Sequence, residues 1–178
     1  MKEKFPIDMY INLRLYFVKL LYKGNLMKIF IMRHGEAEMF AKSDKDRTLT
    51  EFGEKSSASQ GIWLKETAGY FNKVLVSPYI RAKQTFEYIN NIFSEQLTER
   101  AETWDAITPY GKAEVVVDYL STLFDEDIKQ VLIVSHLPLV GEIVAELCGK
   151  NNVSFLPATI AEIDWDAEMG KLIQTKNP

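Results

Sequence analysis

The stretch KIFIMRHG, residues 28–35, decides the fold of this chain, and the stretch QVLIVSH, residues 130–136, has the same form. Each is an apolar run of strand length, rich in β-branched residues, that stops at a histidine. His34 and His136 are the only two histidines in 178 residues. Continuous apolar runs are typical of parallel strands buried on both faces. Because ligands of α/β proteins bind at the carboxyl ends of such strands, we expect both histidines to lie in an active site.

Apolar runs alternate with helical patterns from Met27 onward, which is typical of an α/β fold. We expect strands at residues 28–33, 73–77, 97–101 and 131–135, helices at 50–67, 77–92, 111–124 and 138–147, and a closing hairpin of 159–164 with 171–174. Thr50 and Ser77 are the expected N-caps, and Gly149 is the expected C-cap. The pattern predicts a three-layer sandwich with a mostly parallel central sheet and an antiparallel edge. The polar segment 37–47 is expected to be a mobile active-site loop.

Size and composition place limits on the function. The length fits one domain, and a net charge of −4 argues against a general nucleic-acid surface. The single cysteine, Cys148, cannot form an internal disulfide and fits a buried thiol in a cytoplasmic protein. No segment reaches the roughly 18 consecutive apolar residues of a membrane span, so no stable membrane association is expected.

Residues 1–26 form an N-terminal extension before the predicted domain at residues 27–178. Asn12, Arg14 and Lys19 interrupt its apolar part, which also lacks the features of a signal peptide. One interpretation is a basic amphipathic helix that lies on a membrane or on the domain. The other is that Met27 is the true start, because the codons of the preceding Lys23-Gly24 suit a ribosome-binding site.

Basic side chains stand at several element boundaries. Arg33 and His34 follow the first strand, Arg81 lies near a helix start, and His136 follows the strand at 131–135. Singly, each is most often structural. Together, two guanidiniums can bind phosphate oxygens, helix N-termini favour anions, and a neutral imidazole can attack phosphorus. The pattern predicts a phosphoryl site, and no spacing of Asp, Glu and His indicates a metal site or another cofactor.

Three motifs in fixed order resemble the histidine phosphatase superfamily, which includes the phosphoglycerate mutases. They are Arg33-His34-Gly35-Glu36, then Ser77-Pro78 with Arg81-Ala82 and Gln84-Thr85, then Ser135-His136. Segments 47–50, 74–78, 108–111 and 135–141 are similar to its bacterial branch of SixA-type phosphohistidine phosphatases. The resemblance covers Met27 to about Gln174 and implies a phosphoglycerate mutase-like fold. The short interval between Arg81 and His136 leaves no room for a cap domain.

The resemblance also implies roles for the matching residues. His34 is similar to the nucleophile that becomes phosphorylated, and Arg33, Arg81 and His136 to the residues that hold the phosphoryl group. Substrate-binding roles are implied for Arg47, Gly35 and Ser135. The general acid of larger members has no clear match, and Asp105 and Glu102 are the candidates in the corresponding segment.

The missing cap and the uncertain acid favour phosphohistidine on a protein as the substrate. An imidazole leaving group needs less general-acid help than an alkoxide does, and an open site admits a side chain of a folded partner. We expect a metal-independent phosphatase with a phosphohistidine intermediate, acting on a histidine phosphotransfer domain or a phosphotransferase carrier. The resemblance implies that such partners are acidic around the phosphohistidine, and Lys42, Lys45, Arg47 and Lys83 are placed to meet that surface. The alternatives are a small-molecule phosphomonoesterase of the same superfamily and a non-catalytic, phosphate-dependent binding module.

Overall fold

A computed structural model describes residues 26–178, so both interpretations of the N-terminal extension concern residues that lie largely outside the described part. The division into an extension and a domain at residue 27 stays a prediction. Between residues 26 and 178, no helix is long and apolar enough to cross a membrane.

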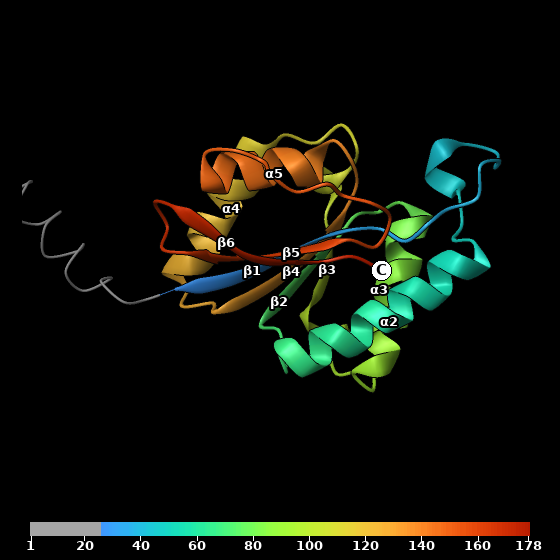
Figure 1. Cartoon of the computed structure of the whole chain (residues 1–178), viewed down its shortest axis with the longest axis horizontal. Helices are drawn as coiled ribbons and strands as arrows, with labels where there is room; N and C mark the ends of the chain where they lie inside the picture. The colour runs from blue at the N-terminus through green and yellow to red at the C-terminus, as the bar shows by residue number, and fades with distance from the viewer. Residues whose placement is uncertain (1–25) are drawn as a thin grey trace, which may run out of the picture.

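A six-stranded sheet in the order β3-β2-β4-β1-β5-β6 forms the centre of the molecule (Figure 1). β1 (Met27–Arg33), β2 (Lys73–Val76), β3 (Ala101–Thr103) and β4 (Gln130–Ser135) run parallel. β5 (Ile160–Trp165) is antiparallel to β1, and β6 (Gly170–Lys176) is antiparallel to β5. The predicted parallel sheet with a closing antiparallel hairpin is therefore confirmed.

Helices cover both faces of the sheet (Figure 1). These are α2 (Glu51–Thr67) with α3 (Ile80–Ile92) on one face, and α4 (Ala113–Asp125) with α5 (Leu139–Cys148) on the other. Ile29 and Ile31 of β1 belong to the core beside α4 and α5, whereas Phe30 and Met32 belong to the core beside α2 and α3. This alternation in one buried strand confirms the three-layer sandwich.

Two expected helix boundaries agree with the structure, and one does not. The hydroxyl of Thr50 caps α2 by accepting a hydrogen bond from the Gly53 amide at 3.0 Å, and Gly149 ends α5 in the left-handed conformation with φ +75°. The prediction that Ser77 caps the next helix is wrong, because α3 begins at Ile80 with Tyr79 as its N-cap. The Ser77 hydroxyl instead contacts the imidazole of His136.

The strand expected at residues 97–101 is also displaced. Residues Thr98–Arg100 form a 3-10 turn, and β3 begins only at Ala101. Leu97 is buried, but its amide donates to the Asn90 side chain at 3.0 Å rather than to a neighbouring strand. Apolar character at Leu97 therefore reflects core packing, not a place in the sheet.

Candidate active site

The carboxyl ends of the parallel strands bring the predicted basic residues to one edge of the sheet. Arg33 is in register with Ser135, so His34 and His136 leave β1 and β4 side by side. Their ring centroids lie 4.9 Å apart. The β2 strand ends beside them at Val76, which places Ser77 at the same edge.

His34 is held with one ring nitrogen toward the protein backbone. Its Nδ1 lies 2.7 Å from the Gly35 carbonyl oxygen, which can only accept, so Nδ1 carries the proton and Nε2 keeps its lone pair. The Arg81 Nε–H donates to this Nε2 at 3.1 Å. Burial is the main cause that lowers the His34 pKa to about 3, and the charges of Arg81 and Arg33 lower it further. The hydrogen bond to the Gly35 carbonyl raises this pKa but is outweighed. A neutral imidazole with an oriented Nε2 is suited to act as a nucleophile.

Arg81 is buried beside His34 and binds the loop that follows β1. Its Nη2 donates to the Asp44 carboxylate at 3.0 Å, and its Nη1 donates to the Asp44 carbonyl at 2.5 Å. The Tyr79 ring lies 4.8 Å from the Arg81 guanidinium carbon. Burial alone would raise the Asp44 pKa, but hydrogen bonds from Arg81 and Arg47 outweigh it and hold that pKa below its ordinary value. Asp44 is therefore an anion bound between two cationic groups.

Arg33 enters the site from the end of β1. Its Nη1 donates to the Phe155 carbonyl at 2.8 Å, which fixes the guanidinium against the segment before β5. Its Nε is buried and has no protein partner. Burial and the nearby charge of Arg81 lower the Arg33 pKa, although an arginine stays protonated at neutral pH. The Nε–H of Arg33 is thus a donor that can serve an anionic ligand.

His136 completes the group of four basic side chains. Its Nε2 lies 2.7 Å from the Ser77 hydroxyl, while its Nδ1 is buried without a protein partner. The Tyr79 ring packs against it at 4.9 Å. Burial, together with the charges of His34 and Arg81, lowers the His136 pKa to about 2. If the Ser77 hydroxyl donates to Nε2, then Nδ1 carries a proton that can reach a phosphoryl oxygen.

The three residues predicted to bind substrate lie at this edge with protein partners. Arg47 donates to the Glu38 carbonyl at 2.5 Å and to Asp44 at 3.1 Å, so Asp44 links it to Arg81. The Gly35 amide donates to the Thr85 hydroxyl at 3.0 Å, and the Ser135 hydroxyl donates to the Ile107 carbonyl at 2.8 Å. These contacts place Gly35 and Ser135 in the framework of the site, and their roles in binding stay predictions.

The two general-acid candidates differ in position. Glu102 accepts from the Tyr119 hydroxyl at 3.1 Å and pairs with Lys73, which stands at the amino end of β2. The hydrogen bond from Lys73 lowers the Glu102 pKa, so this carboxyl is ionised at neutral pH and bound at the amino end of β2. Asp105 is exposed and follows β3 at the carboxyl edge, as the first residue of a 3-10 turn. Of the two, only Asp105 stays a candidate on position.

Several site residues were not predicted. Ser77 belongs to the second motif and Tyr79 follows its proline, but nothing in the sequence indicated that both contact His136. Asp44 stands three residues before Arg47 on the polar loop, and this acid–arginine spacing was a usable signal. The Phe155 carbonyl that binds Arg33 is a backbone group, which any residue would provide, so the sequence cannot indicate this contact. Among residues 26–178, no three His, Cys, Asp or Glu side chains are grouped so that they could hold a metal ion.

Comparison with known proteins identifies the family. The model described as "Histidine phosphatase superfamily (branch 1)" matches residues 29–110. The chain is 54% identical to the phosphohistidine phosphatase SixA homolog of Haemophilus influenzae, over 83% of this chain and 93% of that protein. It is 42% identical to phosphohistidine phosphatase SixA of Escherichia coli, over 79% of this chain and 86% of that protein.

A solved structure of the protein histidine phosphatase SixA complexed with tungstate has the same fold. It matches with a TM-score of 0.80 at 39% identity and covers 85% of this chain and 97% of that one. The predicted fold and the predicted phosphatase class are both confirmed. This chain therefore belongs to the histidine phosphatase superfamily, branch 1.

Proposed function

We propose that this phosphatase removes the phosphoryl group from phosphohistidine on a partner protein, without a metal ion and through a phosphorylated His34. The observation that carries this proposal is the His34 Nε2, which is unprotonated and held 3.1 Å from the Arg81 Nε. The names of the SixA relatives support the choice of phosphohistidine.

The reaction proceeds in two displacements at phosphorus. The His34 Nε2 attacks the phosphoryl group, the phosphorus–nitrogen bond of the substrate breaks, and the substrate imidazole leaves in neutral form with the proton that its other ring nitrogen already carried. Water then attacks phosphorus, the bond to Nε2 breaks, and inorganic phosphate is released. Arg81, Arg33 and the Nδ1–H of His136 stabilise the charge on the phosphoryl oxygens in both steps. The two guanidiniums supply the compensating charge that Mg²⁺ provides in other phosphoryl-transfer enzymes, and His136 adds a neutral hydrogen-bond donor.

The preference for phosphohistidine follows from the poor placement of both candidate general acids. Glu102 is ionised and paired with Lys73, and Asp105 is exposed beyond β3. An alkoxide leaving group would need a proton donor, whereas a protonated imidazole leaves without one. Within residues 26–178, the chain between α3 and β4 forms only short turns, β3 and α4, so no cap covers the site.

The partner is a histidine phosphotransfer domain or a phosphotransferase carrier with acidic residues around its phosphohistidine. Lys42 and Lys45 are exposed on the loop before α2, and Lys83 is exposed in the first turn of α3. Such charges at the rim of a site increase the association rate of an acidic partner. We place the activity in the cytoplasm, where a lone cysteine stays reduced.

Hydrolysis assays with defined substrates test this proposal. The purified protein is incubated with a panel of histidine-phosphorylated proteins and, separately, with sugar phosphates and an aryl phosphate, with and without excess EDTA. We expect the highest kcat/KM on a phosphohistidine protein, no loss with EDTA, and no activity in His34→Ala. Higher kcat/KM on sugar phosphates would favour a small-molecule phosphomonoesterase. Binding without turnover would indicate a non-catalytic module.

A further inference from the structure

Large apolar side chains are exposed on the loops around the active site. Within the described part of the chain, Met39 and Phe40 are 80% and 89% exposed on the loop after β1, and Tyr110 is 83% exposed on the loop after β3. Leu137 follows His136 directly and is 43% exposed, and Leu156, 53% exposed, follows the Phe155 that holds Arg33. We call these five residues the apolar rim. Single exposed apolar residues are common, but several of them on the loops that leave the strand ends at one active site indicate an interaction site.

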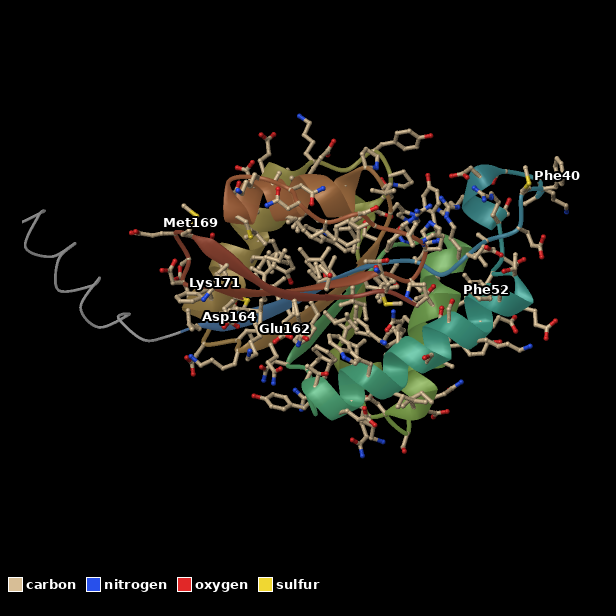
Figure 2. All side chains as sticks on the ribbon, in the orientation of Figure 1. Phe40, Phe52, Glu162, Asp164, Met169 and Lys171 are labelled. Atoms are coloured by element: carbon tan, nitrogen blue, oxygen red, sulfur yellow. The ribbon has the colours of Figure 1, made fainter. Side chains whose placement is uncertain are left out.

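The loop that carries Met39 and Phe40 is attached to the active site. Arg47 donates to the Glu38 carbonyl at 2.5 Å, and Asp44 binds Arg81 at 3.0 Å. In Figure 2, Phe40 lies at the outer end of this loop and points away from the body of the molecule. The loop therefore presents an apolar tip and is itself anchored to Arg81 of the active site through Asp44.

The loop that carries Tyr110 is also packed closely against the rest of the protein. A Cβ at Gly111 would lie 2.0 Å from the Ala106 carbonyl oxygen and 2.8 Å from the Leu139 side chain, so the backbone here packs directly on neighbouring atoms. Tyr110 thus projects from a loop that is pressed against the start of α5. Rigid loops that expose aromatic side chains lose little conformational entropy when they bind a partner.

We propose that the apolar rim is the docking surface for the substrate protein, which presents an apolar patch around its phosphohistidine and acidic residues facing Lys42 and Lys45. This inference rests on the proposed function. His34 is only 7% exposed, and a histidine side chain is short, so the backbone that carries the phosphohistidine must approach the rim closely. A free phosphorylated small molecule reaches the pocket without this contact.

The two parts of the surface act differently on the substrate protein. The apolar rim excludes water and slows dissociation, as aromatic anchors of interfaces do. The lysines act on the association rate, and their effect is screened by salt. The ionic-strength dependence of kcat/KM in each variant therefore separates the contribution of the apolar rim from that of the lysines.

Substitutions on the rim test the proposal in the full-length protein. The double variant Met39→Ala with Phe40→Ala and the single variant Tyr110→Ala remove exposed side chains, so both should keep the wild-type melting temperature. Met169→Ala is the matched control, because Met169 is 60% exposed on the β5–β6 turn at the opposite end of the molecule (Figure 2). For each protein, kcat/KM is measured on a phosphorylated histidine phosphotransfer domain and on free phosphohistidine, at low and high ionic strength.

We expect the rim variants to lose roughly tenfold in kcat/KM on the phosphorylated domain, at both ionic strengths, and to keep wild-type rates on free phosphohistidine. Met169→Ala should match the wild type on both substrates. Unchanged rates of the rim variants on the domain, equal losses on both substrates, or an equal loss in Met169→Ala would each overturn the docking surface. Failure of the wild type to hydrolyse either phosphohistidine substrate would instead overturn the proposed function, and the docking surface with it.

Discussion

At the scale of single residues, the site depends on which nitrogen atoms carry a proton. The Gly35 carbonyl holds the proton of His34 on Nδ1, and Arg81 approaches Nε2 with its Nε–H. Arg33 Nε and His136 Nδ1 are buried without protein partners. Buried polar groups in proteins are usually paired, so these two nitrogen atoms are candidates for contacts with phosphoryl oxygens, His136 Nδ1 in the tautomer in which Ser77 donates to Nε2.

The substitution Arg81→Lys tests the planar geometry of this guanidinium. Lysine keeps the charge but loses the Nε–H that faces His34 and the paired Nη groups. We expect kcat/KM on the phosphohistidine protein to fall by about 10²-fold or more, as for the loss of one preorganised donor. Arg100→Lys, at an exposed arginine of the turn before β3, is the control and should have no effect. A near-normal rate for Arg81→Lys would show that only its charge matters.

Asp44 should compete with phosphate for Arg81 and Arg47. Its carboxylate lies 3.0 Å from Arg81 Nη2 and 3.1 Å from Arg47 Nη1, where an anionic ligand would also gain its hydrogen bonds. In Asp44→Asn, we expect inorganic phosphate to inhibit hydrolysis of an aryl phosphate roughly tenfold more tightly, because a competing negative charge is removed. Inhibition constants measure this directly. Weaker inhibition in the variant would mean that Asp44 positions the arginines for the ligand instead.

At the scale of elements, the start of α2 is packed against the turn that carries the nucleophile. A Cβ at Gly53 would lie 2.0 Å from the Glu36 carbonyl oxygen, and a Cβ at Gly35 would lie 2.6 Å from the Ser57 hydroxyl. The helix and the turn can approach this closely only because both positions are glycine. The position of His34 therefore depends on α2 as well as on β1.

The substitution Gly53→Ala should push the start of α2 away from the turn that follows His34. Overpacking of this kind typically lowers the free energy of unfolding by about 1–3 kcal/mol. We expect that loss in urea denaturation, together with a fall in kcat, because the turn after His34 must shift. Ser59→Ala, at an exposed position of the same helix, should change neither quantity. Loss of stability with full activity would show that the turn does not depend on α2.

The sequence predicted the elements whose pattern is local and missed those that depend on distant contacts. The strands ending at Arg33 and Ser135 were predicted because both faces of each are apolar. Ser77 looks like an N-cap next to a proline, but His136, far along the chain, takes its hydroxyl. The short β3 carries too few residues for a clear pattern, and Asn90 takes the amide of the preceding Leu97.

At the scale of the whole molecule, the two buried histidines link stability to pH. Burial lowers the pKa of His34 to about 3 and that of His136 to about 2, against an ordinary value of 6.5. Between about pH 6.5 and 3 the unfolded chain binds protons that the folded chain does not, so acid favours unfolding in this window. Above this pH window, the two imidazoles are neutral in both the folded and the unfolded chain, so stability no longer depends on their protonation.

We therefore expect the melting temperature of the wild type to fall as the pH is lowered below about 6.5. His34→Ala removes one of the two linked groups, so its melting temperature should fall less steeply over the same window. Thermal unfolding followed by circular dichroism at several pH values tests this. Parallel curves for the two proteins would mean that His34 is protonated in the folded state.

The identity of the phosphorylated residue is the most direct test of the mechanism. The protein is mixed with a phosphohistidine protein, quenched in alkali within the first turnovers, digested, and examined by mass spectrometry. We predict an acid-labile, alkali-stable phosphoryl group on His34, absent from His34→Ala and retained on His34 in proteins with substitutions at the apolar rim. A phosphoryl group on another residue, or rapid hydrolysis by His34→Ala, would contradict the assignment of His34 as the nucleophile.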